Sequence, residues 1–262
     1  LPAPLIRLKE GQRVRLAVTN TLDEDSSIHW HGLLVPFQFD GVPGLSFPGI
    51  KPGATFVYDF PIVQSGTYWY HSHSGMQEAM GHFGPIIIDP AGEDPVVYDR
   101  EHVLILSDWS FTHPHQLMMR LKQSGGYFNR RKQTIAGLLA GKDQSAKDRR
   151  EWAAMLMDPT DISDVTGAAY RFLINGHGNE ENWTGLFNPG ERVRLRIINA
   201  SAMTNFNFRI PDLPMTVVQV DGQHVQPVET DEFQIAIAEA YDVIVQPSGA
   251  EWAEACDRRH GT

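Results

Sequence analysis

A ten-residue segment occurs twice in this sequence, in two closely similar copies. The first copy, GQRVRLAVTN, covers residues 11–20, and the second, GERVRLRIIN, covers residues 190–199. In both copies apolar residues alternate with polar ones, which predicts a strand with one buried face and one wetter face. A repeat of this kind indicates that one fold is used twice along the chain.

Short β-rich stretches recur through the rest of the sequence, separated by Gly, Pro, Asn and Asp. They are residues 13–19, 27–35, 55–60, 66–71, 85–88, 103–106, 170–174, 192–198, 206–210, 216–220 and 242–246. Strands of this length and density are typical of β-sandwiches. Together with the repeat, they predict an all-β chain built from two sandwich domains.

One stretch departs from this pattern. Residues 129–157 are rich in Lys, Arg, Ala, Leu, Gln and Met, which predicts a helical segment, with a break near Gly141. We therefore expect a first domain at residues 1–112, a partly helical insertion at 113–160 and a second domain at 161–262.

The charge pattern bears on possible partners. The chain has 32 Asp and Glu against 22 Lys and Arg, a formal net charge of −10, and these charges are scattered. That argues against nucleic acid or an anionic membrane as a partner. No apolar run approaches the roughly 20 residues of a membrane helix. The start, LPAP, is not a signal peptide, so we expect any export signal to have been removed or not included.

Two His-x-His pairs, His29 with His31 and His71 with His73, are the candidate metal ligands. In a strand, residues i and i+2 point to the same face, so each pair presents two imidazoles toward one place. Neutral imidazole suits copper, zinc, iron or nickel. The alternative, unrelated surface histidines, is weaker because both pairs lie on predicted strands beside Trp and Tyr.

The residues around these pairs carry a family resemblance. The motifs are IHWHGLLVP (28–36), DGVPG (40–44), FPGIKPG (47–53), SGTYWYHSH (65–73), GHFGP (81–85), DW (108–109), HPH (113–115), MDPTDISD (157–164), NGHG (175–178), NWTG (182–185) and VQVDG (218–222). This pattern resembles the multicopper oxidases, and most closely the bacterial copper-resistance oxidases of the CopA/PcoA type. The resemblance covers nearly the whole chain.

The resemblance implies tandem cupredoxin-like Greek-key β-sandwich domains from a three-domain oxidase. It implies a trinuclear copper cluster between the first and third domains, with His29 as a ligand of the type 2 copper. His31, His71 and His73 would bind the type 3 pair, and Asp40 would support proton delivery during oxygen reduction. The implied function is oxidation of Cu(I) or phenolic reductants, with reduction of O2 to water, for copper resistance in the periplasm.

The sequence departs from the family pattern in one respect. In the family the third domain supplies the remaining cluster histidines and, in a His-Cys-His segment, the type 1 copper site, and this segment does not occur here. The single cysteine, Cys256, cannot form an intrachain disulfide and lacks the histidine neighbours of a type 1 ligand.

We expect the chain to lack a strand ahead of Leu1 and the third domain, so that this domain or another chain would complete the copper cluster. The alternative reading is a non-catalytic copper-binding fragment.

Two further signals are weaker. His113 and His115 lie close in sequence to Met118 and Met119 and could form an accessory Cu(I) site, but core packing by the methionines is the favoured interpretation. The second domain has FNF at residues 206–208 where the first has HWH, which predicts that it carries no metal site.

Overall fold

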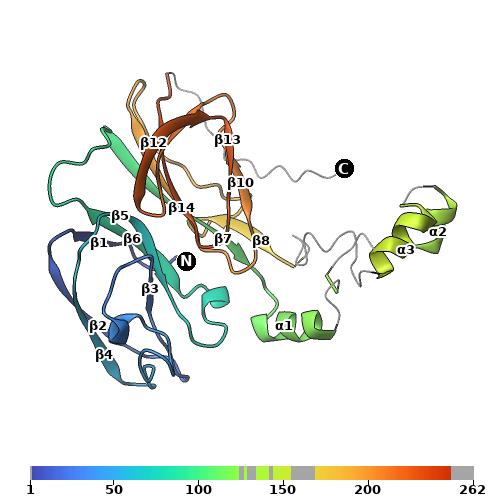
Figure 1. The fold of residues 1–262 in the computed structure, drawn as a ribbon, viewed down its shortest axis with the longest axis horizontal. Coiled ribbons are helices and arrows are strands. Elements are labelled where there is room, and N and C mark those ends of the chain that lie inside the picture. Colours follow the sequence, from blue (N-terminus) through green and yellow to red (C-terminus); the bar gives the residue numbers. More distant parts are fainter. Residues whose placement is uncertain (1, 124–126, 129–133, 142–143, 155–168, 249–262) are drawn as a thin grey trace. The chain divides into compact units, whose positions relative to one another are not determined.

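The computed structural model describes residues 2–123, 127–128, 134–141, 144–154 and 169–248 (Figure 1). The chain forms two compact units, one of Leu1–Asp108 with Phe172–Thr262 and the other of Trp109–Arg171. Cys256 and residues 155–160 of the predicted insertion lie outside the described residues.

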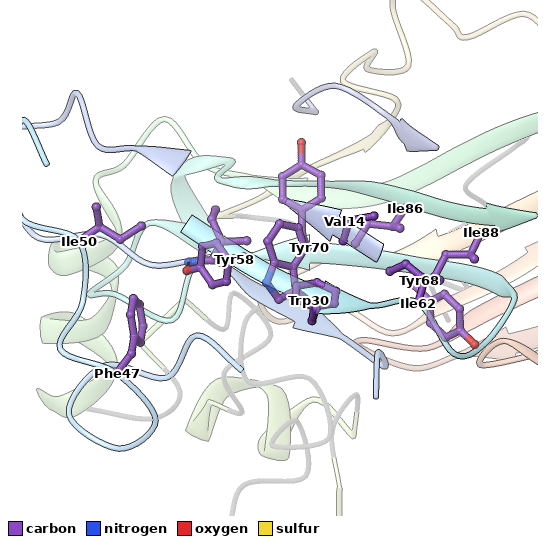
Figure 2. Packing of buried hydrophobic residues seen from close by; sticks show 12 residues of the cluster. Val14, Trp30, Phe47, Ile50, Tyr58, Ile62, Tyr68, Tyr70, Ile86 and Ile88 are labelled. Atoms are coloured by element: carbon purple, nitrogen blue, oxygen red, sulfur yellow. Dashed lines mark hydrogen bonds between the residues drawn. The ribbon is translucent and has the colours of Figure 1, made fainter. Parts of the chain in front are cut away.

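The first sandwich pairs a four-stranded sheet with a two-stranded sheet. The order in the larger sheet is β1 (Ile6–Lys9), β6 (Phe83–Asp89), β5 (Gly66–His71) and β3 (His29–His31), and β2 (Arg13–Thr19) pairs with β4 (Thr55–Pro61) in the smaller one. Trp30, Tyr58 and Tyr70 are among the buried residues of its core, which Figure 2 shows from close by. Two short 3-10 helices, η1 (Phe37–Phe39) and η2 (Glu78–Met80), lie in its loops.

The second sandwich has a six-stranded and a two-stranded sheet. The six strands run in the order β12 (Gln223–Thr230), β11 (Met215–Val220), β14 (Ala240–Val245), β9 (Val193–Asn199), β7 (Arg100–Trp109) and β8 (Arg171–Ile174), while β10 (Phe206–Arg209) pairs with β13 (Glu232–Ile235). The copies of the sequence repeat form β2 and β9. Each pairs antiparallel with a strand later in its own sandwich, β4 or β14.

The unit of Trp109–Arg171 contains the three α-helices of the described residues, α1 (Pro114–Gln123), α2 (Ile135–Leu139) and α3 (Ala146–Ala154). The predicted all-β fold class, with two sandwiches and a partly helical insertion, is confirmed. In the described part of the chain no helix combines the length and apolar character needed to cross a membrane.

The domain limits at residues 112 and 160 stay a prediction. The strand pairing adds that β7, which lies before residue 112, is a parallel neighbour of β9 in the second sandwich. The sequence around a strand does not show which sheet the strand joins, because that depends on its hydrogen-bonded partner. For β7 this partner, β9, lies far away in sequence.

The polar face of the second repeat differs from the prediction. In β2 buried and exposed residues alternate as expected, but every residue of β9 is buried. Arg194 and Arg196, which lie on the face predicted to be the wetter one, are each only 1% exposed. The prediction was therefore wrong for β9, because a second layer of structure covers the face that the sequence pattern marks as polar.

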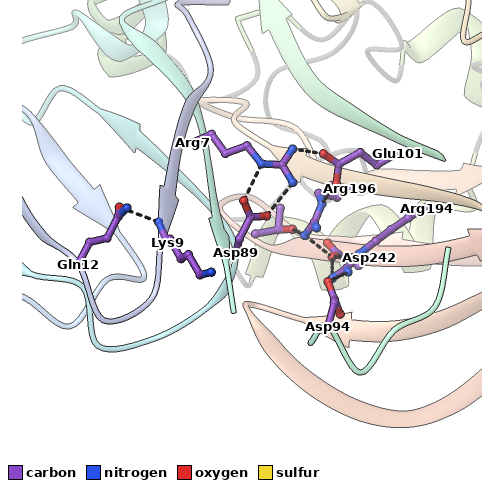
Figure 3. Close-up of polar contacts among 10 residues, drawn as sticks. Arg7, Lys9, Gln12, Asp89, Asp94, Glu101, Arg194, Arg196 and Asp242 are labelled. Atoms are coloured by element: carbon purple, nitrogen blue, oxygen red, sulfur yellow. Dashed lines mark hydrogen bonds and ion pairs between the residues drawn. The ribbon is translucent and has the colours of Figure 1, made fainter. Parts of the chain in front are cut away.

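Carboxylates surround these two arginines (Figure 3). The Asp242 carboxylate accepts from Arg194 Nε at 2.8 Å and from Arg196 Nη1 at 3.0 Å. Asp94 accepts from Arg194 Nη1 at 2.7 Å, and Glu101 accepts from Arg196 Nε at 2.9 Å. A buried guanidinium requires such partners, because an unpaired buried charge is very costly.

The same network joins the two sandwiches. Arg196 Nη1 of β9 donates to Thr67 Oγ1 of β5 at 3.0 Å, and Arg7 of β1 donates to Glu101 of β7. Backbones also approach closely, since a Cβ added to Gly66 of β5 would lie 2.7 Å from Gly222 Cα. The two sandwiches therefore meet in a packed interface with a buried ionic centre.

We predict that Asp242→Ala lowers the free energy of unfolding by about 3–5 kcal/mol, because two buried guanidinium groups lose the carboxylate they share. Urea denaturation followed by tryptophan fluorescence measures this. The control Arg13→Ala breaks a surface pair with Asp59, in which the arginine side chain is 68% exposed, and should cost about 1 kcal/mol or less. Equal effects of the two variants would contradict the prediction.

Candidate metal centre

Strand pairing brings the two histidine pairs together. β3 and β5 are antiparallel, with His29 opposite His71 and His31 opposite Trp69. One ring nitrogen from each of His29, His31 and His71 lies within 4.8 Å of the others, a spacing that could hold a metal ion. The ring of His73, just beyond the end of β5, is centred 4.7 Å from that of His29 and 4.9 Å from that of His71.

The ring of a buried tryptophan, Trp69, packs against two of the histidine rings of this cluster. The ring of Trp69 stacks on that of His71, with centroids 4.1 Å apart and planes 15° apart, and on that of His31 at 5.0 Å. Trp69 also belongs to a small buried core with Ile105 and Ile198 of the second sandwich. The histidine rings therefore rest on a side chain that the sandwich interface holds in place.

Polar contacts at Nδ1 fix the orientation of the His29 and His71 rings. His29 Nδ1 donates to the backbone oxygen of Asp40 at 2.7 Å, and the Asp40 carboxylate Oδ1 lies 3.4 Å from the same nitrogen. His71 Nδ1 lies 2.8 Å from the Glu78 carboxylate Oε2, and its Nε2 is 3.3 Å from His31 Nδ1. The ring nitrogens turned away from these partners are the ones free to bind metal.

Burial favours the neutral form of three of these imidazoles. It lowers the pKa of His29 and of His73, and it lowers the pKa of His31 to about 4, with further lowering from the neighbouring histidines. A neutral imidazole has a free lone pair, which is the form that binds a metal. At neutral pH no proton has to leave these three rings before a metal binds.

The side chain of Gln77 links two segments: the loop just before the first histidine pair, and Ser72, which lies between His71 and His73. Its Oε1 accepts from Ser26 Oγ at 2.9 Å and from Ser72 Oγ at 2.7 Å. Its Nε2 donates to Glu24 Oε1 at 2.8 Å and to the backbone oxygen of Asp25 at 2.9 Å. The side chain is buried, so these bonds satisfy all of its polar groups and pin the loop before β3 to the end of β5.

The structure thus brings together the five residues singled out from sequence, His29, His31, His71, His73 and Asp40, and their roles stay predictions. Sequence reasoning missed Gln77, Glu78 and the stacking role of Trp69. The only signal for the first two was their place a few residues after the second histidine pair. Nothing in the sequence pattern said that the η2 turn folds back onto the cluster.

The secondary histidine pair lies in the other unit. The rings of His113 and His115 stack with centroids 5.4 Å apart and planes 13° apart. Met118 and Met119 are 38% and 65% exposed, so the core-packing role predicted for them is wrong. Among the described residues, the cluster on β3 and β5 is the one with metal-binding spacing.

The donor set fits copper. It consists of imidazole nitrogens, three of them with lowered pKa, converging on one place without a thiolate. Two tandem β-sandwiches with such a cluster at the end of one sheet define a cupredoxin-like protein with a candidate metal centre.

Comparisons with known proteins agree with this class. Family models described as multicopper oxidase match residues 1–93 and 100–258, and the chain therefore belongs to the multicopper oxidase family.

The relatives are copper-resistance proteins and oxidases. The chain is 53% identical over 266 residues to copper resistance protein A of Escherichia coli, covering 98% of the chain and 44% of that protein. Identity to copper resistance protein A of Pseudomonas syringae pv. tomato is 52%, with the same coverage. The chain spans less than half the length of these relatives.

A solved structure shares the fold. The crystal structure of Fet3p, a multicopper oxidase that functions in iron import, superimposes with a TM-score of 0.73 at 28% identity, covering 94% of this chain and 40% of that one. The cupredoxin-like fold predicted from the resemblance is confirmed.

We predict that Gln77→Ala lowers the free energy of unfolding by about 2–4 kcal/mol, because it leaves several buried polar groups without partners. Amide hydrogen exchange should also speed up at Ser26 and Ser72. The control Gln234→Ala removes an exposed amide that donates a 3.3 Å hydrogen bond to Asn207, and it should change stability by about 0.5 kcal/mol or less. An unchanged exchange pattern in Gln77→Ala would argue that Gln77 does not hold the loop before β3 to the end of β5.

Proposed function

We propose that this chain is the N-terminal two-domain part of a periplasmic copper-resistance multicopper oxidase that oxidises Cu(I) or phenolic reductants and reduces O2 to water. The observation that carries the proposal is the convergence of imidazoles from β3 and β5. The names of two relatives that are 53% and 52% identical, both copper resistance protein A, support copper resistance. A third domain or another chain would complete the copper cluster.

We assign the ligands on this chain as predicted. His29 would bind the type 2 copper, and His31, His71 and His73 would bind the type 3 pair. Bound copper supplies the electron transfer that O2 reduction needs. The protein supplies the rest: imidazoles held by the Trp69 ring, and hydrogen bonds that orient their free nitrogens toward one place.

Asp40 has a separate role in the proposal. Reduction of O2 to water consumes protons, and a carboxylate near the cluster can hold and pass them. The Asp40 side chain is 37% exposed, so its carboxylate contacts solvent on one side while Oδ1 lies 3.4 Å from His29 Nδ1 on the other. We propose that Asp40 carries protons from solvent to the cluster.

A second candidate function applies to the 262 residues taken alone. The sequence has no His-Cys-His segment, and its one cysteine lacks the neighbours of a type 1 ligand. By itself the chain would then bind copper at the histidine cluster without turning over. Oxygen uptake that scales with copper loading of this chain alone would overturn this candidate.

Copper binding tests the assignment. We expect His29→Ala, His31→Ala and His71→Ala each to weaken Cu(I) binding by roughly 100-fold or more, because loss of a ligand exceeds the 10- to 100-fold effect of losing a ligand's hydrogen-bond partner. Competition with a chromophoric Cu(I) chelator gives the affinities. The control His224→Ala removes an exposed histidine of β12 and should leave affinity unchanged. Equal affinities in all four variants would place copper elsewhere.

Asp40→Asn tests the proton route in the full-length oxidase. Oxygen consumption should fall by about 10²–10⁴-fold, the usual effect of losing a group that transfers protons. Copper content should stay the same, since the backbone oxygen of Asp40 still accepts from His29 Nδ1. The control Asp231→Asn changes an exposed carboxylate between β12 and β13. Wild-type turnover in Asp40→Asn would remove Asp40 from the mechanism.

A further inference from the structure

The acid that faces His71 is Glu78, the first residue of η2. Its Oε2 lies 2.8 Å from His71 Nδ1, and the two side chains are 28% and 8% exposed. A carboxylate accepts a hydrogen bond, so this contact places the ring proton on Nδ1 and leaves the lone pair on Nε2. That nitrogen faces the cluster, 3.3 Å from His31 Nδ1.

Stacking alone does not set this orientation. Trp69 holds the plane of the His71 ring, but a half-turn about χ2 would keep the rings stacked while moving both nitrogens to the opposite edge. The backbone oxygen of Ser72 also lies near His71 Nδ1, at the longer distance of 3.3 Å. The short contact with Glu78 is therefore the strongest interaction that distinguishes the two ring orientations.

The position of Glu78 is itself well defined. It follows Gln77, whose side chain makes four hydrogen bonds to the loops on both sides of the cluster. The Glu78 backbone oxygen accepts from Gly81 N at 2.8 Å, and Gly81 has a φ of 93°, which glycine adopts without strain. The turn that carries the carboxylate is thus tied to the strands that carry the histidines.

We propose that Glu78 is a positioning residue for His71: its carboxylate accepts a hydrogen bond from Nδ1–H, which fixes the ring orientation and directs Nε2 to the metal. This rests on the proposed function, since His71 is assigned there as a copper ligand. Glu78 touches neither O2 nor reductant in this proposal and acts only through the ring. Such carboxylate–histidine contacts tune affinity at metal sites by raising the basicity of the ligand.

The first test reads the ring directly in the metal-free 262-residue chain. Long-range ¹H–¹⁵N spectra of ¹⁵N-histidine-labelled protein, assigned with His71→Ala, show which nitrogen carries the proton. We expect a protonated Nδ1 in the wild type and in Glu78→Gln, whose amide oxygen still accepts, and a mixture of tautomers in Glu78→Ala. A wild-type ring protonated on Nε2 would overturn the proposal whether or not any variant folds.

The chain offers a matched control. His177 and Glu181 form a histidine–glutamate contact of 3.5 Å on the surface, with the side chains 48% and 73% exposed. Glu181→Ala should leave the His71 signals and the copper affinity unchanged. The comparison separates loss of a carboxylate beside any histidine from loss of the one beside His71.

The second test is Cu(I) affinity by chelator competition. We expect Glu78→Ala to bind roughly 10- to 100-fold more weakly than the wild type, and Glu78→Gln to lie between the two. Wild-type affinity together with a wild-type tautomer in Glu78→Ala would overturn the inference, as would weaker binding with an unchanged tautomer. A wild-type chain that binds no Cu(I) would instead overturn the proposed function, while the spectra would still decide the role of Glu78.

Discussion

Strand β5 contributes to the core of the first sandwich, to the interface between the sandwiches and to the candidate metal centre, because successive side chains of a strand point to opposite faces. Tyr68 and Tyr70 point into the core of the first sandwich, while Thr67, Trp69 and His71 lie on the opposite face. On that face Thr67 bonds to Arg196 of the second sandwich, Trp69 packs in the interface, and His71 joins the cluster. The interface and the candidate metal centre are thus built on one strand face, and a shift of its register would disrupt both.

The buried ionic centre of the interface contributes more to the choice of one relative placement of the sandwiches than to the net free energy of folding. Burying Arg194 and Arg196 is costly, and Asp242, Asp94 and Glu101 offset that cost with short hydrogen bonds. Because each guanidinium has fixed donor directions, the network is satisfied only when the strands lie in this register. We therefore infer that the network selects the relative placement of the two sandwiches, and with it the position of Trp69 under the histidines.

The candidate centre combines rigidity with neutral ligands. The rings are held by stacking on Trp69, by the hydrogen bond from His29 to the backbone of Asp40 and by the hydrogen bonds of Gln77 to the neighbouring loops. Burial lowers the pKa of most of these histidines. A site with pre-oriented neutral ligands loses little conformational entropy when a metal binds. The ligands are therefore held in their binding geometry before a metal arrives.

Local pattern was enough to predict most of the strands, though not β1, β12 or β13, together with the duplicated sandwich and both histidine pairs, because the two-residue period of a strand determines which side chains share a face. It could not predict that β9 is buried on both faces or that β7 joins the second sheet, since both depend on partners far away in sequence. Glu78 and Gln77 were missed for the same reason. The sequence determined which residues can bind a metal, and only the tertiary structure decided which neighbours orient them, because hydrogen bonds and stacking across loops follow from packing and leave no periodic trace.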